Sequence, residues 1–95
     1  MTTRLLALFT ALGFVAACAL PPQGVTQQDL ANFDLAVASI GCDLIGESDY
    51  LPVELQTGLT RQQVIDTAQF RLATDAAVQL ENGGVRLVTG DCAPA

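Results

Sequence analysis

The chain has 95 residues, enough for one small domain and a targeting segment. It contains ten acidic side chains, four arginines and no lysine, histidine or tryptophan, and its net charge at pH 7 is −6. A chain this acidic repels phosphate backbones, and without histidine it lacks the usual general base and zinc ligand. We therefore expect a protein that does not bind nucleic acid, is not an enzyme and carries no cofactor.

The N-terminal segment predicts export. A short start containing Arg4 is followed by an uncharged, mainly apolar run over residues 5–20. This order is typical of a secretory signal, and the run is shorter than the roughly 20 residues that a transmembrane helix needs. The alternative is a retained anchor helix, but Pro21 and Pro22 follow the run directly and no basic stop-transfer cluster appears.

The segment VAAC at residues 15–18 resembles the lipobox of bacterial lipoproteins. In that family the signal is cut before the cysteine, whose thiol is acylated. The resemblance implies a signal peptide over 1–17, acyl chains such as palmitate on Cys18, and anchoring to a membrane of the bacterial cell envelope, facing the periplasm. Ordinary cleavage after Ala19 is the alternative, and it gives a soluble periplasmic or secreted protein.

A tether and a first helix are predicted next. Residues 18–25 contain two prolines, which favour an extended tether. Thr26 followed by Asp29 is a helix-start signature. The helix is expected over residues 27–40, because apolar side chains recur there at helical spacing: Leu30, Phe33, Val37 and Ile40.

An acidic connection is predicted over residues 43–49, with one extended pair at 44–45. Pro52 suits the first turn of a helix and Gly58 suits a helix end, so a short second helix is expected over residues 52–57.

A third helix is predicted over residues 61–74. Thr60 followed by Gln63 repeats the helix-start signature. The apolar residues after it keep helical spacing: Val64, Ile65, Ala68, Leu72 and Ala76.

A C-terminal β-hairpin is predicted, with strands over about 77–81 and 84–89. Apolar and polar residues alternate on both sides of Asn82-Gly83, a strong hairpin signal because both residues tolerate positive φ. The alternative extends the third helix through Leu80, with Asn82-Gly83 as its cap.

The order of these elements resembles winged-helix domains. The resemblance covers residues 51–88 and implies a small α+β, winged-helix-like domain. Most winged helices read DNA through a basic third helix, whereas Arg61 and Arg71 are opposed here by Asp66 and Asp75. The resemblance therefore implies a protein-contact scaffold rather than a DNA-binding domain.

The cysteines predict a structural disulfide. Once Cys18 is assigned to lipid, Cys42 and Cys92 remain as an even pair. A bond between them closes a loop of about 50 residues and is worth roughly 4 kcal/mol in the chain-entropy model. A redox or metal pair is the alternative, but it requires clustered cysteines or a C-x-x-C motif.

Two surfaces are candidates for contact with a partner. Tyr50, Leu51 and Val53 lie beside the acidic segment, and Asn82 with Gly83 forms the tip of the hairpin. Tyrosine is favoured at interface centres, although Tyr50 would equally close the core over the second helix.

We expect a non-enzymatic envelope lipoprotein that binds another envelope protein as an accessory subunit, adaptor or inhibitor. The alternative is a periplasmic module that binds a small ligand or a divalent metal through the acidic loop 43–49. That loop has only three carboxylates and does not match a twelve-residue calcium loop.

Overall fold

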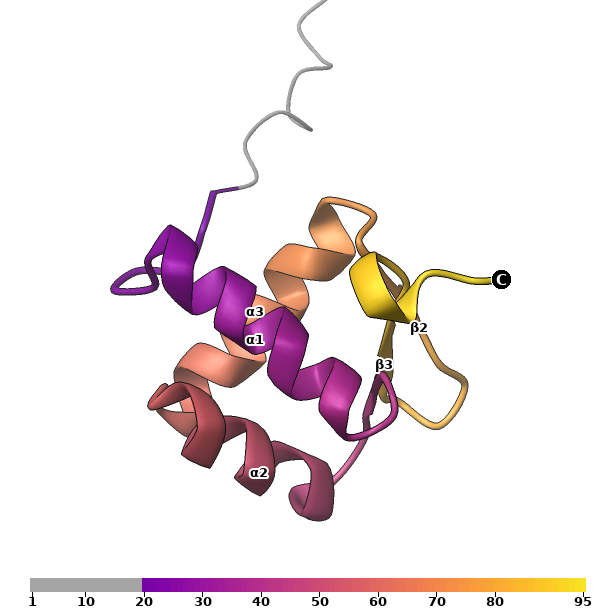
Figure 1. The fold of residues 1–95 in the computed structure, drawn as a ribbon, viewed down its shortest axis with the longest axis horizontal. Helices are drawn as coiled ribbons and strands as arrows, with labels where there is room; N and C mark the ends of the chain where they lie inside the picture. The colour runs from indigo at the N-terminus through magenta and orange to yellow at the C-terminus, as the bar shows by residue number, and fades with distance from the viewer. Residues whose placement is uncertain (1–19) are drawn as a thin grey trace, which may run out of the picture.

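The computed structural model describes residues 20–95, which form three helices and a three-stranded antiparallel sheet (Figure 1). The elements in chain order are α1 (Gln27–Ser39), β1 (Asp43–Leu44), α2 (Glu47–Thr57), α3 (Arg61–Ala73), β2 (Ala77–Gln79), β3 (Val85–Leu87) and the short 3₁₀ helix η2 (Gly90–Cys92). The predicted α+β class, with three helices followed by a hairpin, is confirmed. The predicted signal peptide and Cys18 lie outside the described residues.

Helices α1 and α3 begin with the same cap. The Thr26 hydroxyl accepts from the Asp29 N–H at 3.0 Å, and the Asp29 carboxylate accepts from the Thr26 N–H at 2.9 Å. Thr60 and Gln63 make the same exchange at 3.1 and 3.0 Å. Both predicted helix starts are therefore correct, because a capping box depends only on residues close in sequence.

The residue before each cap is buried. Val25 precedes Thr26, Leu59 precedes Thr60, and both belong to the core. Such a residue fixes the angle at which the chain enters the helix. Val25 also donates its N–H to the Pro22 carbonyl at 3.1 Å. The tether predicted over 18–25 is therefore too long, because its last residues are part of the domain.

Helix α2 begins at Glu47, so the predicted start at residue 52 is wrong. The Asp49 carboxylate accepts from the backbone N–H groups of Ile45 and Gly46, at 2.9 and 3.3 Å, and so caps the helix. Pro52 lies inside the helix, where it removes one backbone donor. The second half of the acidic segment is the first turn of a helix rather than a loop.

Helix α3 ends at Ala73, which excludes the alternative of a longer third helix. Asp75 has a φ of 64°, and its N–H bonds the Leu72 carbonyl at 3.2 Å. The next N–H, of Ala76, bonds the Arg71 carbonyl at 2.9 Å. This pair of bonds is a Schellman motif, which closes the helix and releases the chain into β2.

The strands pair in the order β1-β3-β2. Asp43 of β1 lies opposite Arg86, and Ala77 of β2 lies opposite Leu87. Residues 77–79 and 85–87 form the hairpin strands, which are shorter than predicted, and β1 begins one residue before the predicted pair 44–45.

The hairpin turn is longer than the two residues Asn82-Gly83. Leu80 donates to the Gly84 carbonyl at 2.8 Å, and its own carbonyl accepts from Gly83 at 3.1 Å. Gly83 has a φ of 90°, whereas Asn82 does not have positive φ. The Asn82 side chain instead accepts from the Gly84 N–H at 3.0 Å. This is a type I turn followed by a left-handed glycine.

The core lies between the helices and one face of the sheet. Its apolar members from the helices and their flanks are Val25, Leu30, Phe33, Ala36, Val37, Val53, Leu59, Val64 and Ala68, and those from the strands are Leu44, Ala77, Val85 and Leu87. Thr67 is fully buried among them, and its hydroxyl donates to the Gln63 carbonyl at 2.7 Å. Within residues 20–95, no helix is both long and apolar enough to span a membrane.

Candidate functional site

Cys42 and Cys92 are bonded to each other. Their Cα atoms lie 5.6 Å apart across a sequence separation of 50 residues. Cys42 directly follows the turn that ends α1, and Cys92 is the last residue of η2, which lies against α1. The predicted pair is therefore at disulfide distance, and it attaches the C-terminal segment to the end of the first helix.

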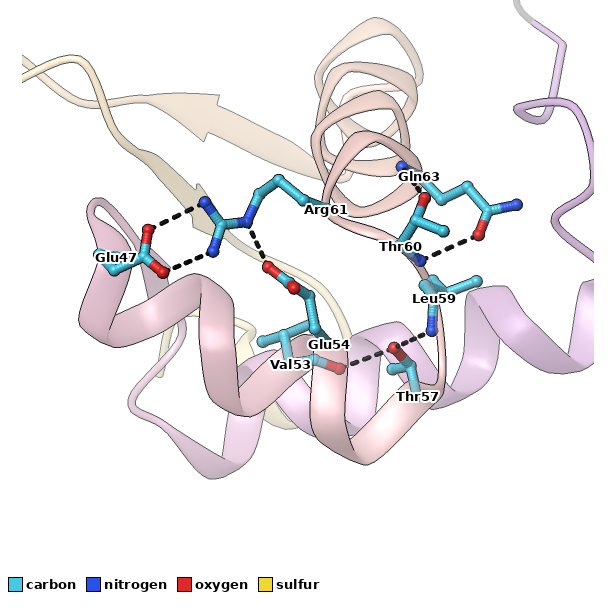
Figure 2. Close-up of polar contacts among 8 residues, drawn as sticks. All are labelled: Glu47, Val53, Glu54, Thr57, Leu59, Thr60, Arg61 and Gln63. Atoms are coloured by element: carbon cyan, nitrogen blue, oxygen red, sulfur yellow. Dashed lines mark hydrogen bonds and ion pairs between the residues drawn. The ribbon is translucent and has the colours of Figure 1, made fainter.

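Arg61, the first residue of α3, reaches back to two glutamates of α2 (Figure 2). Its Nη1 and Nη2 atoms donate to the two carboxylate oxygens of Glu47 at 2.9 and 2.7 Å, and its Nε donates to Glu54. The guanidinium also lies 5.1 Å from the centre of the Tyr50 ring. One cation thus joins three residues that α2 places on one face, at positions i, i+3 and i+7.

These contacts shift the pKa values of the partners. Hydrogen bonding to Arg61, with its positive charge, lowers the pKa of Glu47. Hydrogen bonding to Glu47 and Glu54 raises the pKa of Arg61 above its usual value. Both shifts favour the charged forms of Glu47 and Arg61.

The turn between α2 and α3 is fixed by a second polar connection (Figure 2). The Thr57 hydroxyl donates to the Val53 carbonyl at 2.7 Å and accepts from the Leu59 N–H at 3.1 Å. Together with the Arg61 cluster, this connection holds α2 in a defined position against α3.

The other two arginines of the described part also join separate elements. Arg71 of α3 donates to both oxygens of Asp34 on α1, at 3.0 and 2.7 Å. Arg86 of β3 donates to both oxygens of Asp43 on β1, at 2.7 and 2.9 Å, and this bonding lowers the pKa of Asp43. Each arginine in residues 20–95 therefore binds an acid of the same domain.

The acidic segment 43–49 does not gather its carboxylates in one place. Asp43 binds Arg86, Glu47 binds Arg61, and Asp49 caps α2. Within the described part of the chain, no group of three or more acidic or cysteine side chains is placed to hold a metal ion. The hypothesis of a cation site in this segment therefore gains no support from the geometry.

The three residues of the candidate surface on α2 have different environments. Val53 has no exposed side chain and belongs to the core, so its assignment to an interface is wrong. Leu51 lies two positions before Val53, and residues two positions apart on a helix point about 200° away from each other. Leu51 therefore faces outward, and its side chain is 47% exposed. Tyr50 is half-buried, packs against the core and lies beneath Arg61.

Leu55 was missed by the sequence reasoning as a surface residue. Its side chain is 76% exposed, and it lies one helical turn after Leu51 on the same face of α2. The spacing from the buried Val53 is the signal that places both leucines outside the core. We call Leu51 and Leu55 the α2 leucine pair.

Asn82 and Gly83 form the exposed tip of the hairpin, as predicted. Figure 1 places this turn on a different side of the domain from α2. The two candidate surfaces therefore do not combine into one. Both tip residues also have a local role, because they form the turn itself.

Comparison with known proteins found no family model that matches the chain, and no match among curated proteins or solved structures. The relation to lipoproteins and to the winged-helix family therefore remains a prediction from the residues.

Proposed function

We propose that the protein is a non-enzymatic lipoprotein of the bacterial cell envelope, anchored through acyl chains on Cys18, whose domain acts by binding another envelope protein. The lipobox-like segment before Cys18 supports the anchor. The Cys42–Cys92 pair supports export, because disulfides persist in oxidising compartments such as the periplasm.

The α2 leucine pair is the observation that carries the binding proposal. Two large apolar side chains, 47% and 76% exposed, lie side by side on one helix face of a strongly acidic domain. Helix α2 is held by Arg61 and by the Thr57 connection, so the leucines are presented on a rigid support. A preorganised apolar contact of this kind loses little entropy when a partner binds.

The acidic residues support a protein partner rather than a nucleic acid. Residues 20–95 contain three arginines and ten acids, and every one of these arginines is already bound to a carboxylate. A phosphate backbone would meet a net negative surface. A protein with an apolar patch and a basic rim is the complementary partner.

Site-specific photo-crosslinking in the bacterial host tests this proposal. A photo-reactive phenylalanine analogue replaces Leu55 in the full chain, and the matched control carries it at Gln69, an exposed position on α3. We expect position 55 to give a discrete adduct with one envelope protein and position 69 to give none. Identical adducts from both positions, or no adduct from position 55, would contradict binding through α2.

The anchor is tested separately with Cys18→Ser. We expect this substitution to move the protein from the membrane fraction to the soluble fraction or to block its processing. A Cys18→Ser variant that is processed and stays in the membrane would contradict lipidation, without bearing on the α2 leucine pair.

A further inference from the structure

An open hollow of about 310 Å³ lies between α1 and residues 89–91, which include the first two residues of η2. Its apolar floor is formed by Ala31, Leu35 and Ala38, which share one face of α1. Its opposite wall is formed by residues 89–91. Leu35 is 61% exposed, so the floor is a surface that the domain itself leaves uncovered.

Two acidic residues, Asp34 and Asp91, also line the hollow, and the environments of their carboxylates differ. Asp34 is neutralised by Arg71, which donates to both of its oxygens. Asp91 is exposed, and none of the ion pairs among residues 20–95 involves its carboxylate. The hollow therefore combines an aliphatic floor with one carboxylate that has no positively charged partner within residues 20–95.

We propose that this hollow binds an arginine side chain presented by a partner protein. The three-carbon stem of arginine fits the floor of Ala31, Leu35 and Ala38, and the guanidinium pairs with Asp91. Arginine suits such a site because it places its stem on apolar surface while its planar head binds a carboxylate through two hydrogen bonds. The proposal is independent of the anchor and of the α2 leucine pair.

Residues 20–95 of a second copy do not supply that arginine. The three arginines of residues 20–95 are each bound to a carboxylate on another element of their own domain. Using one of them in a dimer would break a pair that joins two elements. Because Arg4 falls within the predicted signal peptide, we expect the complementary cation to come from a different protein.

The Cys42–Cys92 bond fixes the position of the two sides of the hollow relative to each other. Asp91 directly precedes Cys92, and Cys42 follows the end of α1, so the bond holds the acidic wall beside the helix that forms the floor. Binding of arginine is therefore expected to require the oxidised protein.

Fluorescence anisotropy tests the proposal with a defined probe. The probe is a labelled, capped tetrapeptide, alanine-leucine-arginine-alanine, titrated against the purified full chain at low salt. The matched probe carries citrulline, which has nearly the same shape as arginine but no charge. We expect the arginine probe to bind more tightly than the citrulline probe, with an affinity that falls as salt is added.

Two substitutions locate the binding. Asp91→Asn is expected to weaken binding of the arginine probe by roughly three- to tenfold, the range of one partly exposed charge-assisted contact. Leu35→Ala is expected to weaken both probes. Asp75→Asn removes the same charge from an exposed position at the end of α3 and serves as the control, with binding expected to stay within about twofold.

The proposal is overturned by any of three results: equal binding of the arginine and citrulline probes, equal effects of Asp91→Asn and Asp75→Asn, or no binding up to about 5 mM probe, the range of the weakest specific contacts. The α2 leucine pair supplies an internal check. Loss of binding only in Leu51→Ala and Leu55→Ala would assign the probe to α2 and would also overturn the proposal.

Discussion

Cys42 and Cys92 are separated by 50 positions in the sequence, yet their Cα atoms lie 5.6 Å apart and their sulfur atoms are bonded. Cys42 holds a φ of 75°, a left-handed conformation that few residues other than glycine adopt. Its N–H bonds the Val37 carbonyl at 2.9 Å, and its carbonyl accepts from the Leu87 N–H at 2.9 Å. The same residue thus closes the turn after α1, bonds to the sheet and binds the C-terminal segment.

Removal of the disulfide is predicted to destabilise the domain strongly. The double substitution Cys42→Ser with Cys92→Ser should lower the free energy of unfolding by about 4 kcal/mol, because the unfolded chain gains the entropy of an open 50-residue loop. A domain this small has only a few kcal/mol to lose. Urea unfolding followed by circular dichroism measures the change, and reduced wild-type protein should behave like the double variant. A loss below about 1 kcal/mol in both would contradict this role.

Asp75→Gly is predicted to stabilise the protein by about 1 kcal/mol. Asp75 has a φ of 64° at the position after α3 where glycine is preferred, and its negative charge lies at the unfavourable end of the helix dipole. Asp75→Ala removes the same charge but keeps a Cβ in the left-handed region. The glycine variant should therefore be more stable than the alanine variant in thermal unfolding. Equal melting temperatures of the two variants would show that the left-handed backbone at residue 75 does not reduce the stability of the alanine variant.

The ion pair between Asp43 and Arg86 predicts a pH dependence of stability at acid pH. Because Arg86 lowers the pKa of Asp43 in the folded state, the stabilisation is present above the unfolded pKa of about 3.9 and is lost as pH falls through the folded value. Asp43→Asn and Arg86→Gln should each lower the urea midpoint at pH 6. Their difference from the wild type should shrink as pH falls toward 2. A difference in urea midpoint that stays constant from pH 6 to pH 2 would contradict stabilisation by the ion pair between Asp43 and Arg86.

Gly84→Ala is predicted to destabilise the sheet by roughly 1–3 kcal/mol. A Cβ on Gly84 would lie 2.6 Å from Cγ1 of Ile45 and 3.1 Å from the Leu44 carbonyl oxygen, so the chain around β1 would have to move. Gly46→Ser is the matched control, since a Cβ there meets no atom within 4 Å and serine is a good N-cap. If both variants lose equal stability, the close approach of Ile45 is not the cause.

The elements that depend on neighbouring residues could be predicted from the sequence. Thr26 and Thr60 begin α1 and α3 because each is paired with a polar side chain three residues later. Gly83 indicates the hairpin because it supplies the one positive φ that the turn needs. The pairing of Cys42 with Cys92 followed from counting the cysteines and from the place of each beside a predicted element.

The remainder depends on residues that are distant in sequence. Glu47 and Glu54 bind Arg61 of another helix, and Asp43 binds Arg86, 43 positions away in the sequence. Because these partners are distant, the sequence alone predicts a solvated loop for the acidic segment. Pro52 predicted a helix start at residue 52, whereas α2 begins at Glu47, where the Asp49 side chain caps it. The requirement for glycine at position 84 could not be predicted either, because the side chain that a Cβ would meet there belongs to Ile45, which follows β1.

The lipoprotein proposal is tested most simply by the intact mass of the protein recovered from the membrane fraction of its native host or of a bacterial expression host. We expect the mass of residues 18–95 with a multiply acylated glyceryl group on Cys18, less two hydrogens for the bond between Cys42 and Cys92. An uncleaved chain, or an unacylated chain that starts at Leu20, would contradict the lipoprotein assignment. A mass without the loss of two hydrogens would contradict the disulfide on which the domain and its hollow depend.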